Sequence, residues 1–550
     1  MTQGMTQDRA SERAFETISP FEFKNELIRL ARQEDKKGAR ALLNAGRGNP
    51  NWVCATPRDA FWLLGQFATE ECRRTWSDHD LAGKPAELGC ADRLRAFLQA
   101  QTPSEAVTLL QGTLALSSTL LFHDDAFVHE LTDGIIGDNY PQPDRMLVHT
   151  EQVVHQYLVQ ELCAGECAGG GFELFATEGA TAAMCYLFDS FTENFLLAAG
   201  DRVAIMVPIF PPYVEIPHLA KYNFEVVEIR ADALDDHGHH TWQYPDCELD
   251  KLRDKAVKAL FLVNPSNPPS VALDAQARAR IQSIVASDNP NLMIITDDVY
   301  STFVEGFRSL MVDLPHNTAC VYSFSKYFGV TGWRLGVIAI HRDNVFDKLI
   351  RDLDSASKRR LADRYASLSL KPESLRFVDR IVADSRQVAL NHTAGISTVQ
   401  QVQMALFCSF ALLDERNRYK QQTRQICQRR MQLLYAGLGL EPPLLPNDAD
   451  YYTQFDLLHW ARREHGEMFA KFLTDQYEPV DVLFRLAERS GIVLLGGGGF
   501  YGPPWSIRVS LANLDDASYS QIGHDLRAVL AAYVEEWKQA QEAAASGVTS

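Results

Sequence analysis

The sequence lacks the features that mark membrane-spanning and nucleic-acid-binding proteins. No apolar stretch approaches the roughly 20 residues that a helix needs to cross a bilayer. The formal net charge is −18, so a surface that could hold a phosphate backbone is not expected. The polar amino-terminal segment lacks the apolar core of a secretory signal, which favours a cytoplasmic protein with no membrane or nucleic-acid partner.

The cysteines and histidines also lack a binding framework. Ten cysteines are spread over the chain, which indicates free thiols in a reducing compartment. Neither the pair Cys163 and Cys167 nor the group His237, His239 and His240 has the spacing of a four-ligand metal site. We expect a helix turn and a polar loop at these positions, and no metal.

What the chain does contain is enough apolar sequence for a large enzyme. Its 550 residues are 46% hydrophobic, which suffices for two or three domains with separate cores. From residue 172 to 340, apolar strand patterns alternate with helical ones, as is typical of a mainly parallel sheet covered by helices on both faces. A helical stretch at 54–135, two later strands near 451–458 and 505–514, and a terminal helix from 516 predict helical insertions and a smaller α+β domain.

The most informative segment is SFSKYFGVTGWR at 323–334. Residues 319–325 are expected to form a buried strand, so Lys326 would emerge at its carboxyl end, where open α/β sheets bind their ligands. A lone lysine at a strand end is usually a solvated charge. Here, however, Ser323, Ser325 and Arg334 could hold a phosphate while Lys326 holds an aldehyde as a Schiff base. This combination points to pyridoxal 5′-phosphate.

Three more polar residues follow neighbouring strands. Asp297 ends the apolar strand of NLMIITDD, and a carboxylate buried there would be costly unless it met a cation such as a protonated pyridine nitrogen. Tyr300 and Asn267 could each donate a hydrogen bond to the phenolic oxygen of the ring. Taken alone, the Asn-Pro sequence at 267 would indicate only a turn.

Two further features are ambiguous when taken singly. Gly179 and Ala180 join a strand to a helix, and free amides at that helix start could cradle a phosphate. Phe210 follows another strand and could stack on a cofactor ring, or could equally be plain core.

Together and in this order, the motifs resemble the fold type I pyridoxal phosphate enzymes, within the class I and II aminotransferases, from about residue 44 to 513. The resemblance implies an α/β fold whose large domain has a mainly parallel seven-stranded sheet between helices, plus a smaller α+β domain. We expect an amino-terminal arm and substrate loop at 1–53, a helical insertion at 54–135, a large cofactor-binding domain at 136–341, and a small domain with a helical insertion at 342–550.

The same resemblance implies roles for single residues. Lys326 would be the Schiff-base lysine, Asp297 the partner of the pyridine nitrogen, and Arg334 with Ser323 the phosphate anchors. Arg508 matches the arginine that grips the substrate α-carboxylate with a bidentate fork. Tyr140 resembles the tyrosine that reaches the phosphate of a neighbouring subunit, so a homodimer is expected at minimum, with a larger homo-oligomer left open. A cis peptide is expected at Asn267-Pro268 by the same analogy.

Several positions depart from the usual family pattern. The chain is longer than an ordinary aminotransferase, Pro269 and Ser270 replace a threonine-glycine pair, and Glu178 occupies a position where a small hydroxyl residue is common. The extra length, with the segments SPFEFK and LNAGRGNPNW, is most similar to family members that both transaminate L-aspartate and remove its β-carboxylate. Such enzymes would form L-alanine and carbon dioxide through a ketimine and an enamine, with keto acids as further substrates.

Candidates for contact with the β-carboxylate lie in loops around the site. Arg47, beside Gly48 in the AGRGNP loop, is the first candidate, although a surface arginine in a glycine turn is an equally good interpretation. Lys24 in the arm and Thr393 in NHTAG are weaker candidates.

Two other functions stay open at this point. An ordinary aspartate or aromatic aminotransferase with helical insertions would need a keto acid acceptor and release no carbon dioxide. A non-enzymatic pyridoxal-binding regulator would carry a basic recognition helix, and the acidic charge argues against it.

Overall fold

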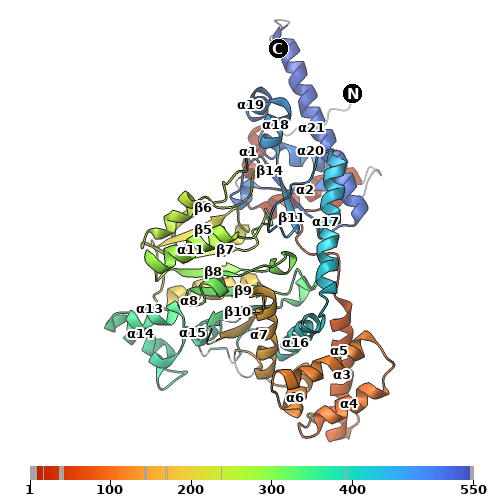
Figure 1. Cartoon of the computed structure of the whole chain (residues 1–550), viewed down its shortest axis with the longest axis vertical. Helices are drawn as coiled ribbons and strands as arrows, with labels where there is room; N and C mark the ends of the chain where they lie inside the picture. Colours follow the sequence, from red (N-terminus) through yellow and green to blue (C-terminus); the bar gives the residue numbers. More distant parts are fainter. Residues whose placement is uncertain are drawn as a thin grey trace.

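The computed structural model describes residues 9–545 apart from 17, 36–41, 141–144, 167–168, 170, 237, 389 and 392. The molecule is elongated, with three groups of elements along its long axis (Figure 1). A group of helices from the first third of the chain lies at one end, the large sheet lies in the middle, and the carboxyl-terminal elements lie at the other end together with the amino-terminal arm.

The large sheet has seven strands in the order β4-β10-β9-β8-β7-β5-β6. Its strands are β4 (Phe172–Thr177), β5 (Arg202–Val207), β6 (Glu225–Arg230), β7 (Val257–Val263), β8 (Met293–Asp297), β9 (Thr318–Ser323) and β10 (Gly336–His341). β10 runs antiparallel to both of its neighbours, and the other pairings are parallel. The mainly parallel seven-stranded sheet expected from the sequence is confirmed.

Helices cover both faces of this sheet, and its inner strands are nearly continuous apolar runs. Successive residues of a strand point to opposite faces. Val203 and Ile205 of β5 therefore pack in one core with α8 (Ala180–Glu193), while Ala204 and Met206 pack in another with α11 (Ala275–Ser287).

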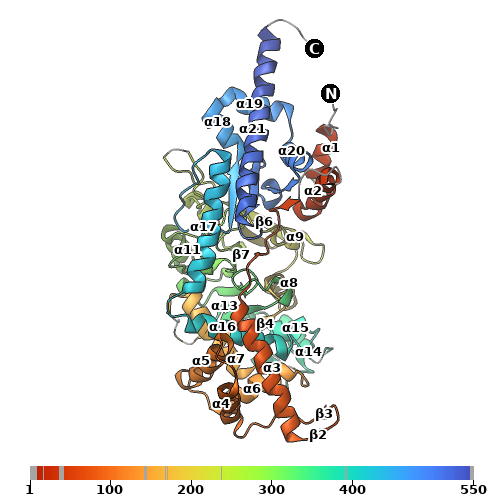
Figure 2. The ribbon, with the colours of Figure 1, turned by 90° about the vertical axis from the view of Figure 1, so that its right-hand side faces the viewer.

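Residues 55–136 fold as a helical unit at one end of the molecule. It contains α3 (Ala55–Thr75), α4 (Cys90–Ala100), α5 (Glu105–Thr119), α6 (Asp124–Ile136) and a short hairpin of β2 (Ser77–Asp78) and β3 (Leu81–Ala82). α7 (Val148–Leu162) and α16 (Thr398–Leu413) lie between this unit and the sheet (Figures 1 and 2). The apolar faces of these helices join the core of the large sheet, so the insertion is attached by packing rather than by a linker.

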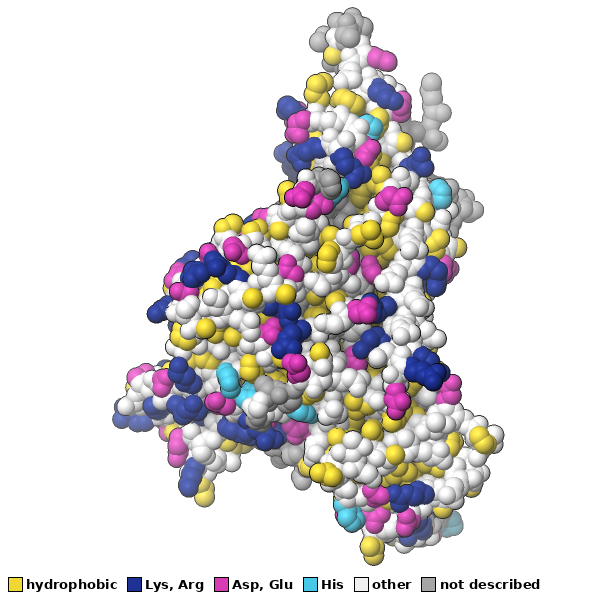
Figure 3. Space-filling model, in the orientation of Figure 1, with side chains coloured by type: hydrophobic (Ala, Val, Ile, Leu, Met, Phe, Trp, Pro, Cys, Tyr) yellow, Lys and Arg dark blue, Asp and Glu magenta, His cyan; other side chains and the backbone are white. Residues whose placement is uncertain are grey.

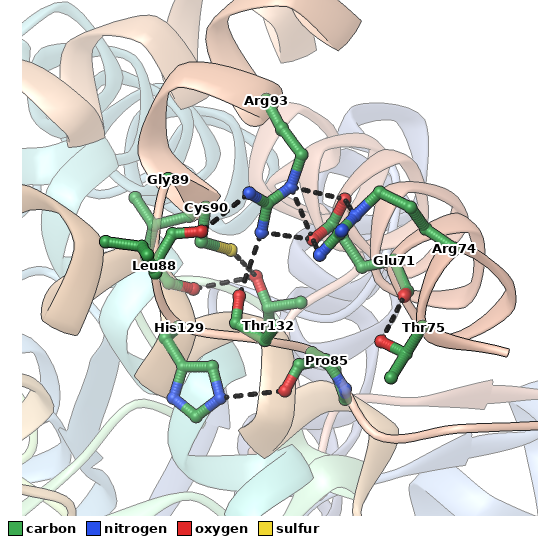
Figure 4. A network of polar contacts seen from close by, with 12 residues as sticks. Glu71, Arg74, Thr75, Pro85, Leu88, Gly89, Cys90, Arg93, His129 and Thr132 are labelled. Atoms are coloured by element: carbon green, nitrogen blue, oxygen red, sulfur yellow. Dashed lines mark hydrogen bonds and ion pairs between the residues drawn. The ribbon is translucent and has the colours of Figure 1, made fainter.

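A buried carboxylate holds the insertion together (Figure 4). Glu71 of α3 is 3% exposed and accepts hydrogen bonds from Arg93 at 2.8 Å and Arg74 at 3.0 Å. Burial alone would raise the pKa of Glu71, but the bonds from Arg93 and Arg74 outweigh it and hold the pKa below its usual value. Arg93 also donates to the carbonyls of Ala86 and Leu88, which fixes the loop before α4.

The carboxyl-terminal elements form a smaller α+β unit. α17 (Arg418–Leu438) and α21 (Asp516–Ala545) pack closely beside an antiparallel sheet of β11 (Tyr452–Asp456), β14 (Ser506–Ser510) and β13 (Leu495–Gly496). The helices α18 (Leu457–His465), α19 (Glu467–Gln476) and α20 (Asp481–Ser490) complete the unit. A Cβ at Gly523 would lie 2.1 Å from the carbonyl oxygen of Leu434, so glycine is needed where α17 and α21 approach most closely.

The amino-terminal arm belongs to the core of this smaller unit. It forms α1 (Arg9–Glu16), α2 (Pro20–Asp35) and β1 (Leu43–Asn44), and β1 pairs in parallel with β12 (Ile492–Val493). Pro20 is the first residue of α2, where its missing N–H costs no helical hydrogen bond. Phe23 and Leu27 of α2 pack in the same core as α17 and α21.

The remaining helices are α9 (Pro211–His218), α10 (Asp246–Leu249), α12 (Leu310–Asp313), α13 (Val345–Asp352), α14 (Ser355–Tyr365) and α15 (Phe377–Ser385). On the face in Figure 3, both signs of charge are interspersed, with basic side chains gathered over α13 and α14. Lys358, Arg359 and Arg360 are exposed on α14. In the part of the chain that the structure describes, no helix is long and apolar enough to cross a membrane.

Candidate active site

A cavity of about 320 Å³ lies where the central strands of the large sheet end, facing the smaller sheet. Parallel strands place their carboxyl ends at one edge, so residues distant in sequence meet there. The sequence-predicted residues that line it are Gly48, Ala180, Phe210, Asn267, Asp297, Tyr300, Ser323, Ser325, Lys326, Arg334 and Arg508.

Lys326 projects into the cavity from the turn that follows β9. Its Nζ donates a hydrogen bond to the carbonyl oxygen of Gly48 at 3.1 Å. A Cβ at Gly48 would lie 3.2 Å from this Nζ and 2.4 Å from the hydroxyl of Tyr452. Position 48 must therefore be glycine for the loop to approach the lysine this closely.

Asp297 ends β8, the strand next to β9, and is 4% exposed. Burial raises the pKa of Asp297 to about 6, although hydrogen bonds from the Tyr213 hydroxyl at 2.6 Å and the Val299 amide at 3.2 Å oppose the shift. Both of these partners are neutral. The carboxylate therefore still favours a cation in the adjoining cavity.

A cradle of residues suited to hold a phosphate also lines the cavity. The Oγ atoms of Ser323 and Ser325 are 2.9 Å apart, and both residues line the cavity. Arg334 donates to the carbonyl oxygens of Thr331 and Glu178, each at 2.9 Å. These contacts hold the guanidinium beside the first turn of α8, whose free amides also favour an anion.

Gly179 makes the contact between Arg334 and α8 possible. Its φ is +90°, and a Cβ at this position would lie 2.3 Å from Arg334 Nη2, so both observations require glycine. The carboxylate of the preceding Glu178 turns away and accepts a hydrogen bond from Tyr186 at 3.0 Å. Glu178 therefore contributes its backbone carbonyl to this cradle, through the hydrogen bond from Arg334.

Asn267 and Tyr300 lie on the wall that faces the smaller sheet. The Oδ1 of Asn267 accepts a hydrogen bond from Arg508 at 3.0 Å, so its amide nitrogen is the atom that it can offer to a cofactor. The hydroxyls of Tyr300 and Tyr452 form a hydrogen bond of 2.9 Å. The cis peptide expected at Asn267-Pro268 is confirmed.

Arg508 is a buried cation at the same wall. It lies on β14, is 1% exposed, and stacks over the Tyr452 ring at 4.4 Å. Its Nη2 donates to the carbonyl oxygen of Gly46 at 2.7 Å, while its Nε has no hydrogen-bond partner among the described residues. Burial lowers the pKa of Arg508. Such a group is suited to bind a carboxylate.

The arm adds further cations near Arg508. Lys24 of α2 is half-buried and lies 5.4 Å from the centre of the Phe21 ring, which lines the cavity. Burial lowers the pKa of Lys24, and the nearby charges of Arg47 and Arg508 lower it further. Arg47 is exposed. Three positive groups therefore lie near one another, and Arg508 is the one that lines the cavity.

Five predicted residues do not line the cavity, namely Gly179, Lys24, Arg47, Tyr140 and Thr393. Tyr140 is 70% exposed at the surface, and residues 141–144 after it lie outside the described part of the chain. The Thr393 amide donates to Asn391 at 3.4 Å, in a loop that reaches β4 through Gly395. In the described residues no group of histidine, cysteine, aspartate and glutamate side chains is placed to hold a metal, and Cys167 and His237 lie outside that description.

Sequence reasoning missed several residues that line the cavity, namely Phe21, Asn49, Thr181, Tyr213, Val263, Val299, Thr331 and Tyr452. Tyr213 could have been found, because it lies three residues after Phe210 at the start of α9 and so shares its side of the helix. Tyr452 could not, since it depends on the pairing of β11 with β14.

Docking of the arm depends on a buried acid. Glu12 of α1 lies beside Asp481 of α20, and burial together with the carboxylates of Asp481 and Glu478 raises the pKa of Glu12 to about 8. The arm therefore docks with Glu12 protonated. Glu12 precedes α2, the helix that carries Phe21 at the cavity.

The donor set fits pyridoxal 5′-phosphate. A buried carboxylate, a lysine amine and a cradle of hydroxyls, guanidinium and helix amides match its pyridine nitrogen, aldehyde and phosphate respectively. Fold and site together define an enzyme of the fold type I class. Residues 177–523 match the model of the family described as aminotransferase class I and II, and the chain belongs to this family. Pyridoxal 5′-phosphate is the cofactor of this family, as expected from the sequence.

One relative is similar over nearly the whole chain. The bifunctional aspartate aminotransferase and L-aspartate beta-decarboxylase of a Pseudomonas species is 49% identical over 529 residues, covering 96% of this chain and 98% of that protein. The aspartate aminotransferase of Sulfolobus acidocaldarius is 32% identical over 154 residues, covering 27% of this chain and 36% of that protein.

Solved structures share the fold at lower identity. The aspartate aminotransferase of Rhizobium meliloti superposes with a TM-score of 0.57 at 16% identity, covering 96% of this chain and 99% of that chain. The Thermus thermophilus aspartate aminotransferase with maleate gives a TM-score of 0.55 at 16% identity, covering 96% of this chain and 100% of that chain. Both likenesses concern the architecture alone.

Replacing Tyr213 with phenylalanine should weaken retention of the cofactor. Without the hydroxyl, the pKa of Asp297 rises above about 6, so its carboxylate is protonated over more of the neutral range. Loss of one hydrogen bond to a charged group corresponds to roughly tenfold to a hundredfold in affinity. Retained cofactor is measured by absorbance after dialysis at a series of pH values. Tyr222→Phe, which removes a hydroxyl bonded to Asp189, is the control, and equal curves for the two variants would contradict the assignment.

The arm should undock as the pH rises. The pKa of Glu12 is 4.5 in the free arm and about 8 in the docked arm, so docking takes up a proton between these pH values. Docking is therefore strongest below pH 4.5 and weakens as the pH rises to about 8. The rate of proteolytic cleavage in the arm should rise by up to about tenfold per pH unit in this window. Glu12→Gln stays neutral and should flatten the profile, whereas Glu22→Gln, an exposed acid of the same arm, should not. A Glu12→Gln profile as steep as the native one would show that another group controls docking.

Proposed function

We propose that this chain removes the β-carboxylate of L-aspartate to form L-alanine and carbon dioxide, and that it also transaminates aspartate. The observation that carries the proposal is the group of three neighbouring cations formed by Arg508, which lines the cofactor cavity, with Lys24 and Arg47. Three neighbouring cations suit a substrate with two carboxylates. The near full-length similarity to a bifunctional aspartate aminotransferase and L-aspartate beta-decarboxylase supports the same substrate.

Arg508 is assigned to the α-carboxylate. Its side chain is fixed by bonds to Asn267 and Gly46, so the guanidinium is oriented before substrate arrives. A fixed fork loses less entropy on binding than a free side chain. The buried Nε, which no described residue engages, is one donor that the substrate can use.

Lys24 and Arg47 are assigned to the β-carboxylate. How tightly they bind the β-carboxylate decides between decarboxylation and transamination. A tight ion pair stabilises the carboxylate before it leaves and so opposes its loss. Lys24 is a half-buried amine whose pKa is already lowered, and Arg47 is exposed to water. Both features weaken the hold on the β-carboxylate and favour its departure.

The bound cofactor supplies an electron sink for the pair released when a bond at the substrate breaks. Asp297 keeps the pyridine nitrogen protonated, which sustains that capacity, and Asn267 and Tyr300 bond the phenolic oxygen. Lys326 holds the cofactor and then, as a free amine, moves protons at the α-carbon and returns one to the β-carbon. Ser323, Ser325, Arg334 and the first turn of α8, with Gly179 and Ala180, hold the phosphate.

The assembly is proposed to be a homodimer at minimum. Tyr140 is exposed in a single chain, as expected of a side chain that serves the site of a neighbouring subunit. A keto acid acceptor completes the transamination.

The decisive assay is aspartate without any added keto acid. Alanine and carbon dioxide should appear in equal amounts over many turnovers, because decarboxylation consumes no second substrate. Both products are followed together, alanine by chromatography and carbon dioxide by manometry. If neither accumulates beyond the enzyme concentration while added keto acid supports turnover, the protein is an ordinary aspartate aminotransferase.

Arg47→Gln should raise the ratio of alanine to oxaloacetate. A weaker hold on the β-carboxylate raises KM by roughly tenfold, as loss of a hydrogen bond to a charged group does, while carboxylate loss itself becomes easier. The two products are quantified from one reaction that contains an acceptor keto acid. Arg29→Gln removes an arginine from the same arm that pairs with Glu26, and serves as the control. An unchanged ratio in Arg47→Gln would remove Arg47 from the substrate site.

A further inference from the structure

The turn that carries Lys326 is held in part by segments outside the large sheet. Residues 327–329, directly after the lysine, present three successive carbonyl oxygens to these segments. Each of them accepts a hydrogen bond from another segment. The donors come from the segment at 52–54, from the first helix of the insertion, and from the start of α17.

The first of these carbonyls has two donors. Tyr327 O accepts from the indole of Trp52 at 3.1 Å and from the hydroxyl of Tyr419 at 2.9 Å. The second, Phe328 O, accepts from the backbone amide of Cys54 at 3.2 Å. Gly329 has a φ of +63°, and a Cβ there would lie 2.1 Å from the Trp52 carbonyl oxygen. The turn is therefore pressed against the segment that leads into the insertion.

Arg58 of α3 holds the third carbonyl. Its Nη2 donates to Gly329 O at 2.7 Å, and its Nη1 donates to Phe328 O at 3.4 Å and also bonds the Cys54 carbonyl. One guanidinium thus joins the lysine turn to Cys54, the residue that precedes the first helix of the insertion. Such a fork has a fixed geometry that a lysine or an amide does not reproduce.

The guanidinium is itself fixed by aromatic rings. Its central carbon lies 5.2 Å from the centre of the Trp333 ring and 5.6 Å from that of Phe407 on α16. Trp333 directly precedes Arg334, and its ring also packs against Phe61 of α3 at 6.0 Å. The first helix of the insertion therefore contacts the segment 326–334 near both of its ends, at the lysine turn and at the phosphate-binding arginine.

We propose that the helical insertion acts as a brace for the segment 326–334, with Arg58 as the positioning residue. The brace sets the position of the Lys326 amine relative to the phosphate cradle. The amine must meet the same cofactor atom after every turnover, and displacements of about 1 Å can cost roughly a hundredfold in rate. This role does not depend on whether the enzyme decarboxylates or only transaminates.

The test uses the holoenzyme and two variants of Arg58. Arg58→Met keeps an apolar side chain between the rings but removes the fork, and Arg58→Lys keeps the charge alone. The first readout is the pH midpoint of the visible absorption of the lysine-cofactor Schiff base. The second is the rate of cofactor loss on dialysis, set against the thermal midpoint of unfolding.

Arg95→Met provides the matched control. Arg95 lies on α4 of the same insertion and pairs at the surface with Asp92 and Asp124. Its loss changes the charge of the insertion equally without touching the lysine turn.

Arg58→Met should shift the absorption midpoint by about one pH unit and speed cofactor loss about tenfold, with Arg58→Lys between it and the native enzyme. Arg95→Met should match the native enzyme in both readouts. A lower thermal midpoint with an unchanged absorption midpoint would show that Arg58 is merely structural and would overturn the proposal. If Arg58→Met does not fold, Arg58→Lys decides by the same two readouts.

Discussion

The buried carboxylate of Asp297 is the constraint on which the site is built. It ends a strand covered on both faces, burial raises its pKa to about 6, and its Tyr213 and Val299 partners are neutral. A charge in that position is stable only when a cation completes it. The strands on either side of β8 then place the other site residues, since Lys326 follows β9 and Asn267 follows β7.

The loop at 46–48 links two parts of the site. Gly46 O accepts from Arg508, and Gly48 O accepts from Lys326 and from Tyr451. Two backbone carbonyls of one short loop therefore bond both the strand that carries Arg508 and the turn that carries Lys326.

Local pattern and chain order are enough to predict the buried strands and the residues that end them. The strands are recognisable because both faces are apolar, and Asp297, Ser323 and Lys326 are recognisable because each stands at or just after such a strand. Contacts that depend on how distant strands pair cannot be predicted from the sequence, and Tyr452 on β11 is one example. The hydrogen bond from Arg58 to Gly329 could not be predicted either, because the sequence of an amphipathic helix does not indicate which carbonyl its arginine will contact.

The arm packs in the core of the smaller unit, whereas the groups that suit the cofactor belong to the large sheet and its helices. On the proposed assignment of Lys24 and Arg47 to the β-carboxylate, substrate charges and cofactor contacts are carried by separate parts of one polypeptide. A substitution at Lys24 or Arg47 would then change which acid is accepted without disturbing the ring, the phosphate or the lysine. New substrate preferences would evolve in this scaffold by changes in a short amino-terminal segment, while the chemistry at Lys326 stays intact.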